Sequence, residues 1–276
     1  MGVLAVAVAE GSADGKARKE ERMVEQIVKG VTAAKAKVVL FDFDGTLSLI
    51  RAGWMDVMVP MMVEILSELK TGESEDELES VVREWVGRLT GKQTIYQMIE
   101  LANQVEKRGG KPLDPLEYKR MYHQRVMDRI EYRLKELRNG HASPEKYLVP
   151  GSRALLESLC ERGLKLYLAS GTDEAYVLDE ARLLDIDRYF DGGIYGAQDD
   201  YKSFSKALLI QRIISGAGYR GEEFLGFGDG YVEIENVKQV GGVAVGVATD
   251  EPDCARIDEW KRTRLVGVGA DFIVPH

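Results

Sequence analysis

Cysteine is scarce in this sequence: Cys160 and Cys254 are the only two among 276 residues. They lie far apart in the chain, and neither has a partner at the spacing of a metal site. A disulfide framework and a cysteine-ligated zinc site are therefore excluded, and a reducing, cytoplasmic setting is expected.

Long hydrophobic runs and an excess of basic residues are also missing. No apolar run reaches the roughly 18 residues that a membrane-spanning helix needs. The short apolar segment at residues 4–9 has no basic region before it, so we expect no secretory signal. Lys and Arg number 37 against 46 Asp and Glu, a net charge of -9. We therefore expect neither nucleic acid nor a membrane as a partner, and an anionic substrate would need a local positive site.

The most informative stretch covers residues 37–48. It begins as a short apolar run rich in β-branched and aromatic residues, which is typical of a strand buried in a parallel sheet. It ends in two acids, Asp42 and Asp44, followed by Gly45 and Thr46. Ionised carboxylates are costly to bury without a cation, and open α/β sheets bind ligands beyond the C-terminal ends of their strands. The pattern indicates a metal and phosphate site, with a simple Asx turn around Gly45 as the alternative.

Residues 48–146 show apolar side chains at helical spacing. A first helix is predicted from Met55 to Leu69, with a kink or restart at Pro60. Three more helices are predicted: one that starts at a capping box of Ser74 and Glu77, one over Thr94–Val105, and one from Leu116 to about Leu137.

One loop of this helical insert, residues 89–94, combines Gly91 with a cation and with hydrogen-bonding side chains. Lys92 and Gln93 are its candidates for substrate contact. A solvated turn between two helices explains the same residues equally well.

From residue 147 onward, strands and helices alternate, which is the pattern of a doubly wound parallel sheet. The strand predicted over residues 164–172 ends in Ser170 and Gly171, just before a helix. Such an end exposes a hydroxyl and free backbone N–H groups, which suit phosphate oxygens, although ordinary helix caps look the same.

A later strand, glycine turn and helix start are predicted over residues 224–236. Asp229 and Glu233 lie there one helical turn apart and face the same side. An acid in the first turn of a helix is also favoured by the helix dipole, so Glu233 has a purely structural explanation as well.

The first 35 residues are interpreted as an N-terminal extension without a catalytic role. Residues 2–10 are compatible with an extra edge strand or the relic of an upstream domain, and residues 11–19 form a polar, flexible segment. Residues 20–35 are predicted as an amphipathic helix with one apolar face, formed by Met23, Val24, Ile27, Val28 and Val31.

The segment Asp42-Phe43-Asp44-Gly45-Thr46 resembles the first motif of the haloacid dehalogenase (HAD) superfamily of phosphohydrolases. The other three motifs follow in order, at Ser170, at a lysine and at Asp229, so that the resemblance spans residues 37–276. It implies an α/β fold with a doubly wound, Rossmann-like core of residues 36–47 and 147–276. Residues 48–146 would form an inserted helical cap of the first type, as in phosphoglycolate phosphatases and β-phosphoglucomutases.

The resemblance also implies a role for each motif residue. Asp42 would attack phosphorus and form an aspartyl-phosphate, and Asp44 would act as general acid and base. Ser170 and Lys206 would grip the phosphoryl oxygens; Lys202 is the alternative lysine. Mg²⁺ would be held by the Asp42 carboxylate, the backbone carbonyl of Asp44 and Asp229, with Glu233 holding a metal-bound water or orienting a ligand. The residues expected around the substrate are Thr46, Gly171, Lys92, Gln93 and Arg51.

The expected activity is Mg²⁺-dependent hydrolysis of a small phosphorylated metabolite, such as a sugar phosphate or phosphoglycolate. The acid at Asp44 argues against halide displacement, because dehalogenases of this superfamily lack an acid there. A phosphomutase of the β-phosphoglucomutase type and a catalytically inactive binding protein are the alternatives. A monomer and a homodimer are both compatible with the sequence.

Overall fold

Strand β2 (Val38–Phe41) lies in the middle of the sheet because all four of its side chains are apolar and buried. The computed structural model describes residues 24–198 and 200–276. In that part of the chain the sheet has seven strands in the order β1-β7-β6-β5-β2-β3-β4. All pairs are parallel except β1 with β7. The other strands are β1 (Glu25–Gln26), β3 (Lys165–Asp173), β4 (Gly193–Ala197), β5 (Phe224–Gly228), β6 (Val243–Val247) and β7 (Phe272–Val274).

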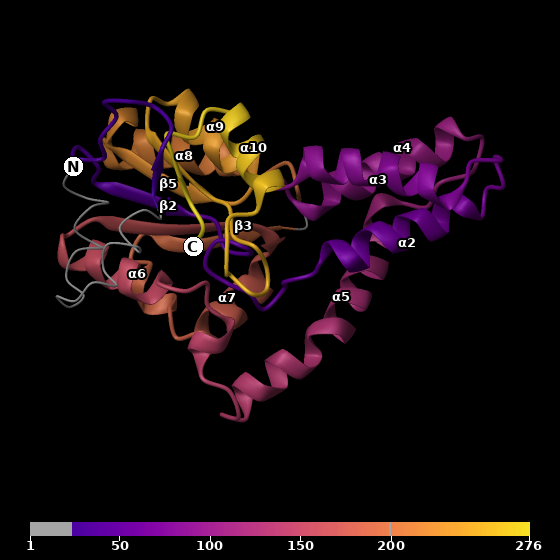
Figure 1. Ribbon diagram of the computed structural model, residues 1–276, viewed down its shortest axis with the longest axis horizontal. Coiled ribbons are helices and arrows are strands. Elements are labelled where there is room, and N and C mark those ends of the chain that lie inside the picture. Colours follow the sequence, from indigo (N-terminus) through magenta and orange to yellow (C-terminus); the bar gives the residue numbers. More distant parts are fainter. Residues whose placement is uncertain (1–23, 199) are drawn as a thin grey trace.

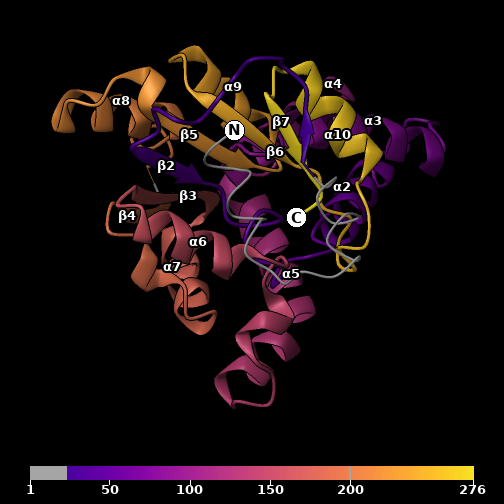
Figure 2. The same ribbon diagram turned by 60° about the vertical axis from the view of Figure 1, so that its left-hand side comes forward.

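Helices cover both faces of this sheet (Figures 1 and 2). One face carries α6 (Ser152–Glu161) and α7 (Glu174–Leu183), and the other carries α8 (Lys206–Ala217), α9 (Tyr231–Gln239) and α10 (Glu259–Gly267). Three short 3-10 helices are η1 (Pro144–Tyr147), η2 (Asp187–Tyr189) and η3 (Gly221–Glu223). The predicted doubly wound α/β fold is confirmed.

Four helices inserted after β2 project beyond one end of the sheet (Figure 1). They are α2 (Met55–Ser67), α3 (Glu75–Leu89), α4 (Thr94–Lys107) and α5 (Pro115–Arg138). The predicted helices of the insert are confirmed, as is the capping box of Ser74 and Glu77. We refer to these four helices as the cap.

Helix α2 runs through Pro60 without a restart. Of the predicted kink or restart, the restart is therefore wrong, and the kink stays a prediction. The N–H that proline lacks would pair with the carbonyl of Asp56, so a single hydrogen bond near the helix start is lost. Buried side chains on both sides of Pro60 hold the helix in place; they are Met58, Val59, Met61 and Met62.

Cap and core share one continuous apolar cluster, which extends from β2 to residues of α2, α3, α4 and α5. At its core end the Phe41 ring stacks on Phe227 at 4.8 Å and meets the edge of Phe190 at 6.2 Å. Such aromatic pairs contribute about 0.5–1.5 kcal/mol each beyond the burial of their area. The cluster therefore holds the cap against the strand that precedes Asp42.

The helix predicted over residues 20–35 is wrong from residue 24 onward. Glu25 and Gln26 form strand β1, and the N–H groups of Ile27 and Val28 donate to the carbonyl of Asp271. Pairing with the open edge of β7 satisfies these backbone groups, and Gly30 has a left-handed φ of 80° that a helix excludes. The interpretations of residues 2–10 and 11–19 lie outside the described residues.

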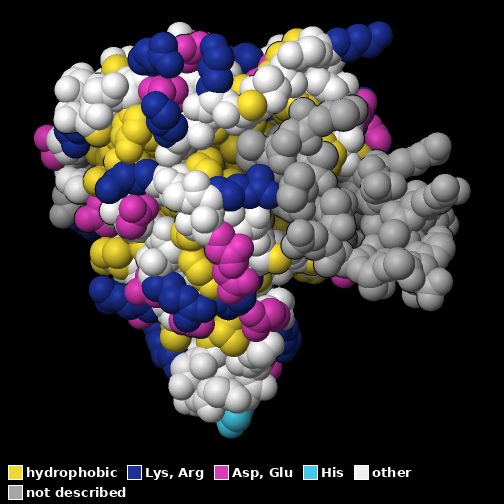
Figure 3. All heavy atoms as spheres, turned by 90° about the vertical axis from the view of Figure 1, so that its left-hand side faces the viewer, with side chains coloured by type: hydrophobic (Ala, Val, Ile, Leu, Met, Phe, Trp, Pro, Cys, Tyr) yellow, Lys and Arg dark blue, Asp and Glu magenta, His cyan; other side chains and the backbone are white. Residues whose placement is uncertain are grey.

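None of the helices in the described part of the chain combines the length and apolar character needed to cross a bilayer. On the side of the molecule away from the cap, basic and acidic side chains are interspersed with apolar ones (Figure 3). The cap end of the sheet is where the predicted site residues lie.

Candidate active site

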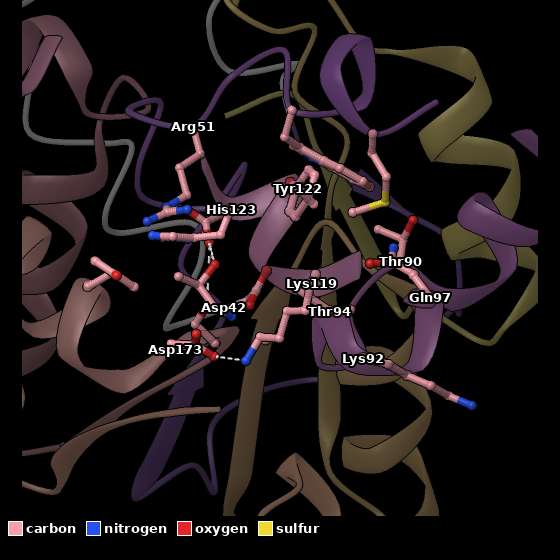
Figure 4. Close-up of a pocket in the computed structure, with 18 of the residues that line it drawn as sticks. Asp42, Arg51, Thr90, Lys92, Thr94, Gln97, Lys119, Tyr122, His123 and Asp173 are labelled. Carbon is pink, nitrogen blue, oxygen red and sulfur yellow. Dashed lines mark hydrogen bonds and ion pairs between the residues drawn. The ribbon is translucent and has the colours of Figure 1, made fainter. Parts of the chain in front are cut away.

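Three neighbouring parallel strands end at the same place and deliver the predicted motif residues. Asp42 directly follows β2, Ser170 lies near the end of β3, and Asp229 directly follows β5. Because β2 pairs with both β3 and β5, these residues meet at one edge of the sheet. They line a cavity of about 90 Å³ between core and cap, together with Asp44 (Figure 4).

Lys206 lies beside Asp42 in the interior. Its Nζ donates to Oδ1 of Asp42 at 2.6 Å and to Oε1 of Glu233 in a short contact. The three side chains are no more than 8% exposed. Lys206 starts α8, where the Ser205 side chain caps the helix by accepting from a backbone N–H. The alternative lysine, Lys202, is exposed, so of the two candidates the structure brings only Lys206 to Asp42.

Asp44 is held by two hydroxyls from the end of β3. Its Oδ2 accepts from Oγ1 of Thr172 at 2.8 Å and from Oγ of Ser170 at 3.3 Å. Its Oδ1 is buried without a hydrogen-bond partner. Burial raises the pKa of Asp44 to about 6, although the Arg51 guanidinium opposes the shift. A carboxyl with this pKa can both donate and accept a proton near neutral pH.

Thr172 was not among the predicted site residues. It lies two positions after Ser170 on the same strand, and side chains of a strand alternate between its faces. The sequence signal that could have identified Thr172 is therefore a hydroxyl side chain two positions after Ser170.

Thr46 links two motifs and does not line the cavity. Its Oγ1 accepts from the backbone N–H of Asp229 at 3.0 Å. The preceding Gly45 has a left-handed φ of 76°, and a Cβ there would collide with the Asp229 carboxylate. Gly45 and Thr46 thus allow the loop that follows β5 to approach the first motif closely.

Arg51 lines the cavity, but its charge is already paired. Its Nη2 lies 2.6 Å from Oε1 of Glu180, and Nε donates to the same carboxylate. Both side chains are almost fully buried. Removing one partner of such a buried pair costs about 3–5 kcal/mol, because the other charge is left without compensation.

The two predicted residues of the cap loop occupy different places. The Lys92 side chain points away from Asp42 in Figure 4, with Nζ 6.0 Å above the Tyr96 ring. Gln93 is buried, and its Nε2 donates to the carbonyls of Tyr201 (2.9 Å) and Phe204 (2.7 Å). Gln93 therefore ties the cap to the segment that precedes Lys206, away from the cavity lining.

The backbone of this loop packs tightly on the core. A Cβ on Gly171 would lie 2.5 Å from the carbonyl oxygen of Lys92. A Cβ on Gly91 would lie 2.8 Å from Oε2 of Glu233, and a Cβ on Gly230 would lie 3.0 Å from the Cα atom of Gly91. Glycines at positions 91, 171 and 230 thus allow the cap loop to approach the strand ends of the core closely.

Helix α5 contributes lining residues that the sequence did not indicate: Lys119, Tyr122 and His123. Lys119 pairs with Asp173 in a short contact, and the His123 ring lies 4.4 Å from that of Tyr176. Burial lowers the pKa of His123, and the nearby Arg51 lowers it further. The only sequence signal was their common helix face, at spacings of three and four residues.

The family model of the haloacid dehalogenase-like hydrolases matches residues 36–241. The chain belongs to this family. No curated protein matches the sequence of this hydrolase.

Solved structures with the same fold include three bacterial proteins. A predicted phosphatase from Clostridium acetobutylicum has 18% identity and a TM-score of 0.54, with 87% of this chain and 94% of that chain covered. A haloacid dehalogenase-like family hydrolase from Streptococcus pneumoniae has 18% identity and a TM-score of 0.53, with 87% and 93% covered. A predicted phosphoglycolate phosphatase from Haemophilus somnus 129PT has 17% identity and a TM-score of 0.50, with 79% and 87% covered. At these identities the likeness extends to the fold alone.

The donors expected to hold Mg²⁺ in this HAD-like hydrolase are oxygens, the type of ligand that this ion prefers. Within residues 24–198 and 200–276, no group of three or more His, Cys, Asp or Glu side chains is arranged to hold a metal. The expected set needs only two carboxylates, those of Asp42 and Asp229, because its third donor is the main-chain carbonyl of Asp44. Burial raises the pKa of Asp42, and the neighbouring Asp229 and Asp44 add to this against the pull of Lys206. Carboxylates crowded in this way favour a hard divalent cation.

Glu233 lies beside Lys206. Its Oε1 accepts a hydrogen bond from Nζ of Lys206, and its Oε2 is buried without a partner. In the described structure it therefore orients the lysine. Its expected contact with a metal-bound water stays a prediction.

Proposed function

We propose that this hydrolase is a Mg²⁺-dependent phosphomonoesterase that acts on a small phosphorylated metabolite. The observation that carries the proposal is the presence of two differently held acids in one cavity between core and cap. Asp42 is bound to Lys206, and Asp44 is bound to hydroxyls. This difference suits one acid to attack and the other to proton transfer.

In the first step an oxygen of Asp42 attacks phosphorus. Lys206 holds Oδ1 of this carboxylate, which leaves Oδ2 to form the new bond. The bond between phosphorus and the leaving oxygen breaks, and the proton of Asp44 goes to that oxygen. The products are an aspartyl-phosphate on Asp42 and the free alcohol.

In the second step water attacks the phosphorus of the aspartyl-phosphate. Asp44, now ionised, takes a proton from this water, and the bond from Asp42 to phosphorus breaks. Inorganic phosphate leaves, and both acids return to their starting states. The hydrogen bond from Thr172 keeps Asp44 oriented through both transfers.

The remaining residues would bind the metal ion and the phosphoryl group. Asp42, Asp229 and the carbonyl of Asp44 would hold Mg²⁺, which supplies positive charge beside the phosphoryl group when it is bound. Ser170 and Lys206 would bind the phosphoryl oxygens, where negative charge is spread in a loose transition state.

The cavity favours a small, polar leaving group. Its volume is about 90 Å³, and its cap side presents Lys119, Tyr122 and His123. Lys119 and Arg51 are both ion-paired, so the wall is polar without a large excess of positive charge. All of these lining residues come from one chain, so the cavity would be complete both in a monomer and in a homodimer.

A phosphomutase is the second candidate, because the cap loop packs so closely on the core beside the cavity that a Cβ on Gly171 would lie 2.5 Å from the Lys92 carbonyl oxygen. A cap held this close to the site can retain a phosphorylated intermediate and exclude water. A mutase would release an isomerised sugar phosphate in place of inorganic phosphate.

The test is initial-rate phosphate release from a panel of phosphorylated metabolites, with Mg²⁺ or with chelator. Wild type is compared with Asp42→Asn, and Asp179→Asn at an exposed position serves as the matched control. Metal-dependent release that only Asp42→Asn abolishes supports the phosphatase. Isomerised product without phosphate release supports the mutase, and equal silence of all three proteins would indicate a binding protein.

A further inference from the structure

A second, largely buried lysine lies against the acid cluster and binds Asp229, whereas Lys206 binds Asp42. Nζ of Lys261 donates to Oδ2 of Asp229 at 3.0 Å and to Oε1 of Glu251 at 2.5 Å. The three side chains are between 10% and 14% exposed. Neither Lys261 nor Glu251 belongs to the motifs that define the site.

The start of α10 holds Lys261 in this position. The Asp258 side chain caps the helix by accepting from the N–H groups of Trp260 and Lys261. The next residue, Arg262, forms an ion pair with Glu25 of β1. The lysine therefore extends from a helix end that is anchored both at its cap and to the sheet edge.

The cluster also touches the first motif. A Cβ on Gly45 would collide with the Asp229 carboxylate and lie 2.8 Å from Oε1 of Glu251. The backbone N–H of Asp229 is held by Thr46, and its Oδ2 by Lys261.

We propose that Lys261 is a positioning residue that fixes one carboxylate oxygen of Asp229 and leaves the other for the metal. The inference rests on the proposed function, because it assigns Asp229 to the Mg²⁺ site. A carboxylate ligand that is hydrogen-bonded through its second oxygen cannot rotate away from the metal. Lys261 thereby lowers the ordering cost of binding.

Glu251 makes this arrangement compatible with a cation. An ammonium group next to a divalent ion would repel it if its charge were not balanced. Glu251 supplies one negative charge against the one positive charge of Lys261. The pair therefore orients Asp229 without changing the net charge of the site.

A charge-neutral double variant tests the proposal. Lys261→Met with Glu251→Gln removes one positive and one negative charge, so the net charge of the site stays the same while Asp229 loses its ammonium partner. Mg²⁺ binding is measured by calorimetry on the purified protein without substrate. Lys238→Met is the control, because Lys238, in the last turn of α9, forms a 2.8 Å ion pair with the buried Asp271, which directly precedes β7.

We expect the double variant to bind Mg²⁺ about 10- to 100-fold more weakly than wild type, the range typical for loss of a partner of a metal ligand. At saturating Mg²⁺ its kcat should return close to the wild-type value, which a general loss of stability would not allow. Lys238→Met should lower the unfolding temperature and leave Mg²⁺ binding unchanged. The single variant Glu251→Gln should also bind Mg²⁺ more weakly, because Lys261 is then unbalanced.

Wild-type Mg²⁺ affinity in the double variant would overturn the proposal. Should the double variant not fold, the single variants Lys261→Arg and Glu251→Gln are measured by the same calorimetry. Unchanged Mg²⁺ affinity in both single variants would overturn the proposal. A wild type that binds Mg²⁺ but hydrolyses no phosphomonoester refutes the proposed function alone. A wild type that binds no Mg²⁺ refutes both.

Discussion

Nζ of Lys206 lies 2.6 Å from Oδ1 of Asp42, although the two residues are 164 positions apart. The contact is buried, and Glu233 shares the same ammonium group. One positive charge thus serves two carboxylates in a region from which water is largely excluded. This arrangement places a cation where the proposed transition state gathers negative charge.

Replacing the two candidate lysines separately should distinguish them. Lys206→Met should lower kcat about 10²- to 10³-fold, the loss typical of one group that stabilises transition-state charge. Lys202→Met should stay close to wild type, because Lys202 is exposed. Initial rates at saturating substrate and Mg²⁺ measure both. A large loss from Lys202→Met would contradict the assignment.

Asp44→Asn should affect poor leaving groups most. We expect kcat to fall about 10²- to 10⁴-fold with an alkyl phosphate, which is the usual contribution of a general acid or base. The loss should be smaller for p-nitrophenyl phosphate, because that leaving oxygen needs no proton. Rates with both substrates measure the difference. Equal losses would argue against proton donation by Asp44.

Gly171→Ala should hinder the approach of the cap. The added Cβ would lie 2.5 Å from the Lys92 carbonyl oxygen, and backbone cannot yield as a flexible side chain does. We expect kcat/KM to fall about 10²-fold, the effect of a misplacement near 1 Å. Gly216→Ala is the control, since no atom lies within 4 Å of its added Cβ. A normal rate for Gly171→Ala would show that this contact is not needed for turnover.

The Glu223 carboxylate should make stability depend on pH. The backbone N–H of Arg220, and then Lys37, lower the pKa of Glu223 from 4.5 to about 2. A carboxylate whose pKa is lower in the folded than in the unfolded state stabilises the folded protein at pH values above about 4.5. This stabilisation is lost as the pH falls toward about 2.

Glu223→Gln should therefore destabilise the protein at pH 7, and by less at pH 3.5. Urea unfolding at both values measures this difference. The control is Glu222→Gln at the neighbouring position, whose ion pair with Lys35 is exposed and contributes little. A Glu223→Gln effect that is the same at both pH values would contradict the explanation.

Local sequence patterns were sufficient for most of the fold. The apolar runs at residues 38–41, 224–228 and 243–247 are strands, as their composition indicates, since buried parallel strands require continuous apolar side chains. The pattern misled at residues 24–35, where the polar Glu25 and Gln26 pair with β7 and no helix forms. A two-residue edge strand leaves no periodicity to detect, and its partner lies more than two hundred residues away.

By itself, the sequence determined the α/β class, the helical insert and the acids at strand ends, because these depend on side-chain type and on spacing within a few residues. Only the tertiary structure decided that Lys206 and not Lys202 meets Asp42, that Thr172 holds Asp44, and that Lys261 holds Asp229. Each of these contacts joins segments between 32 and 164 residues apart. Such an approach is set by strand order and helix packing, which no local spacing encodes.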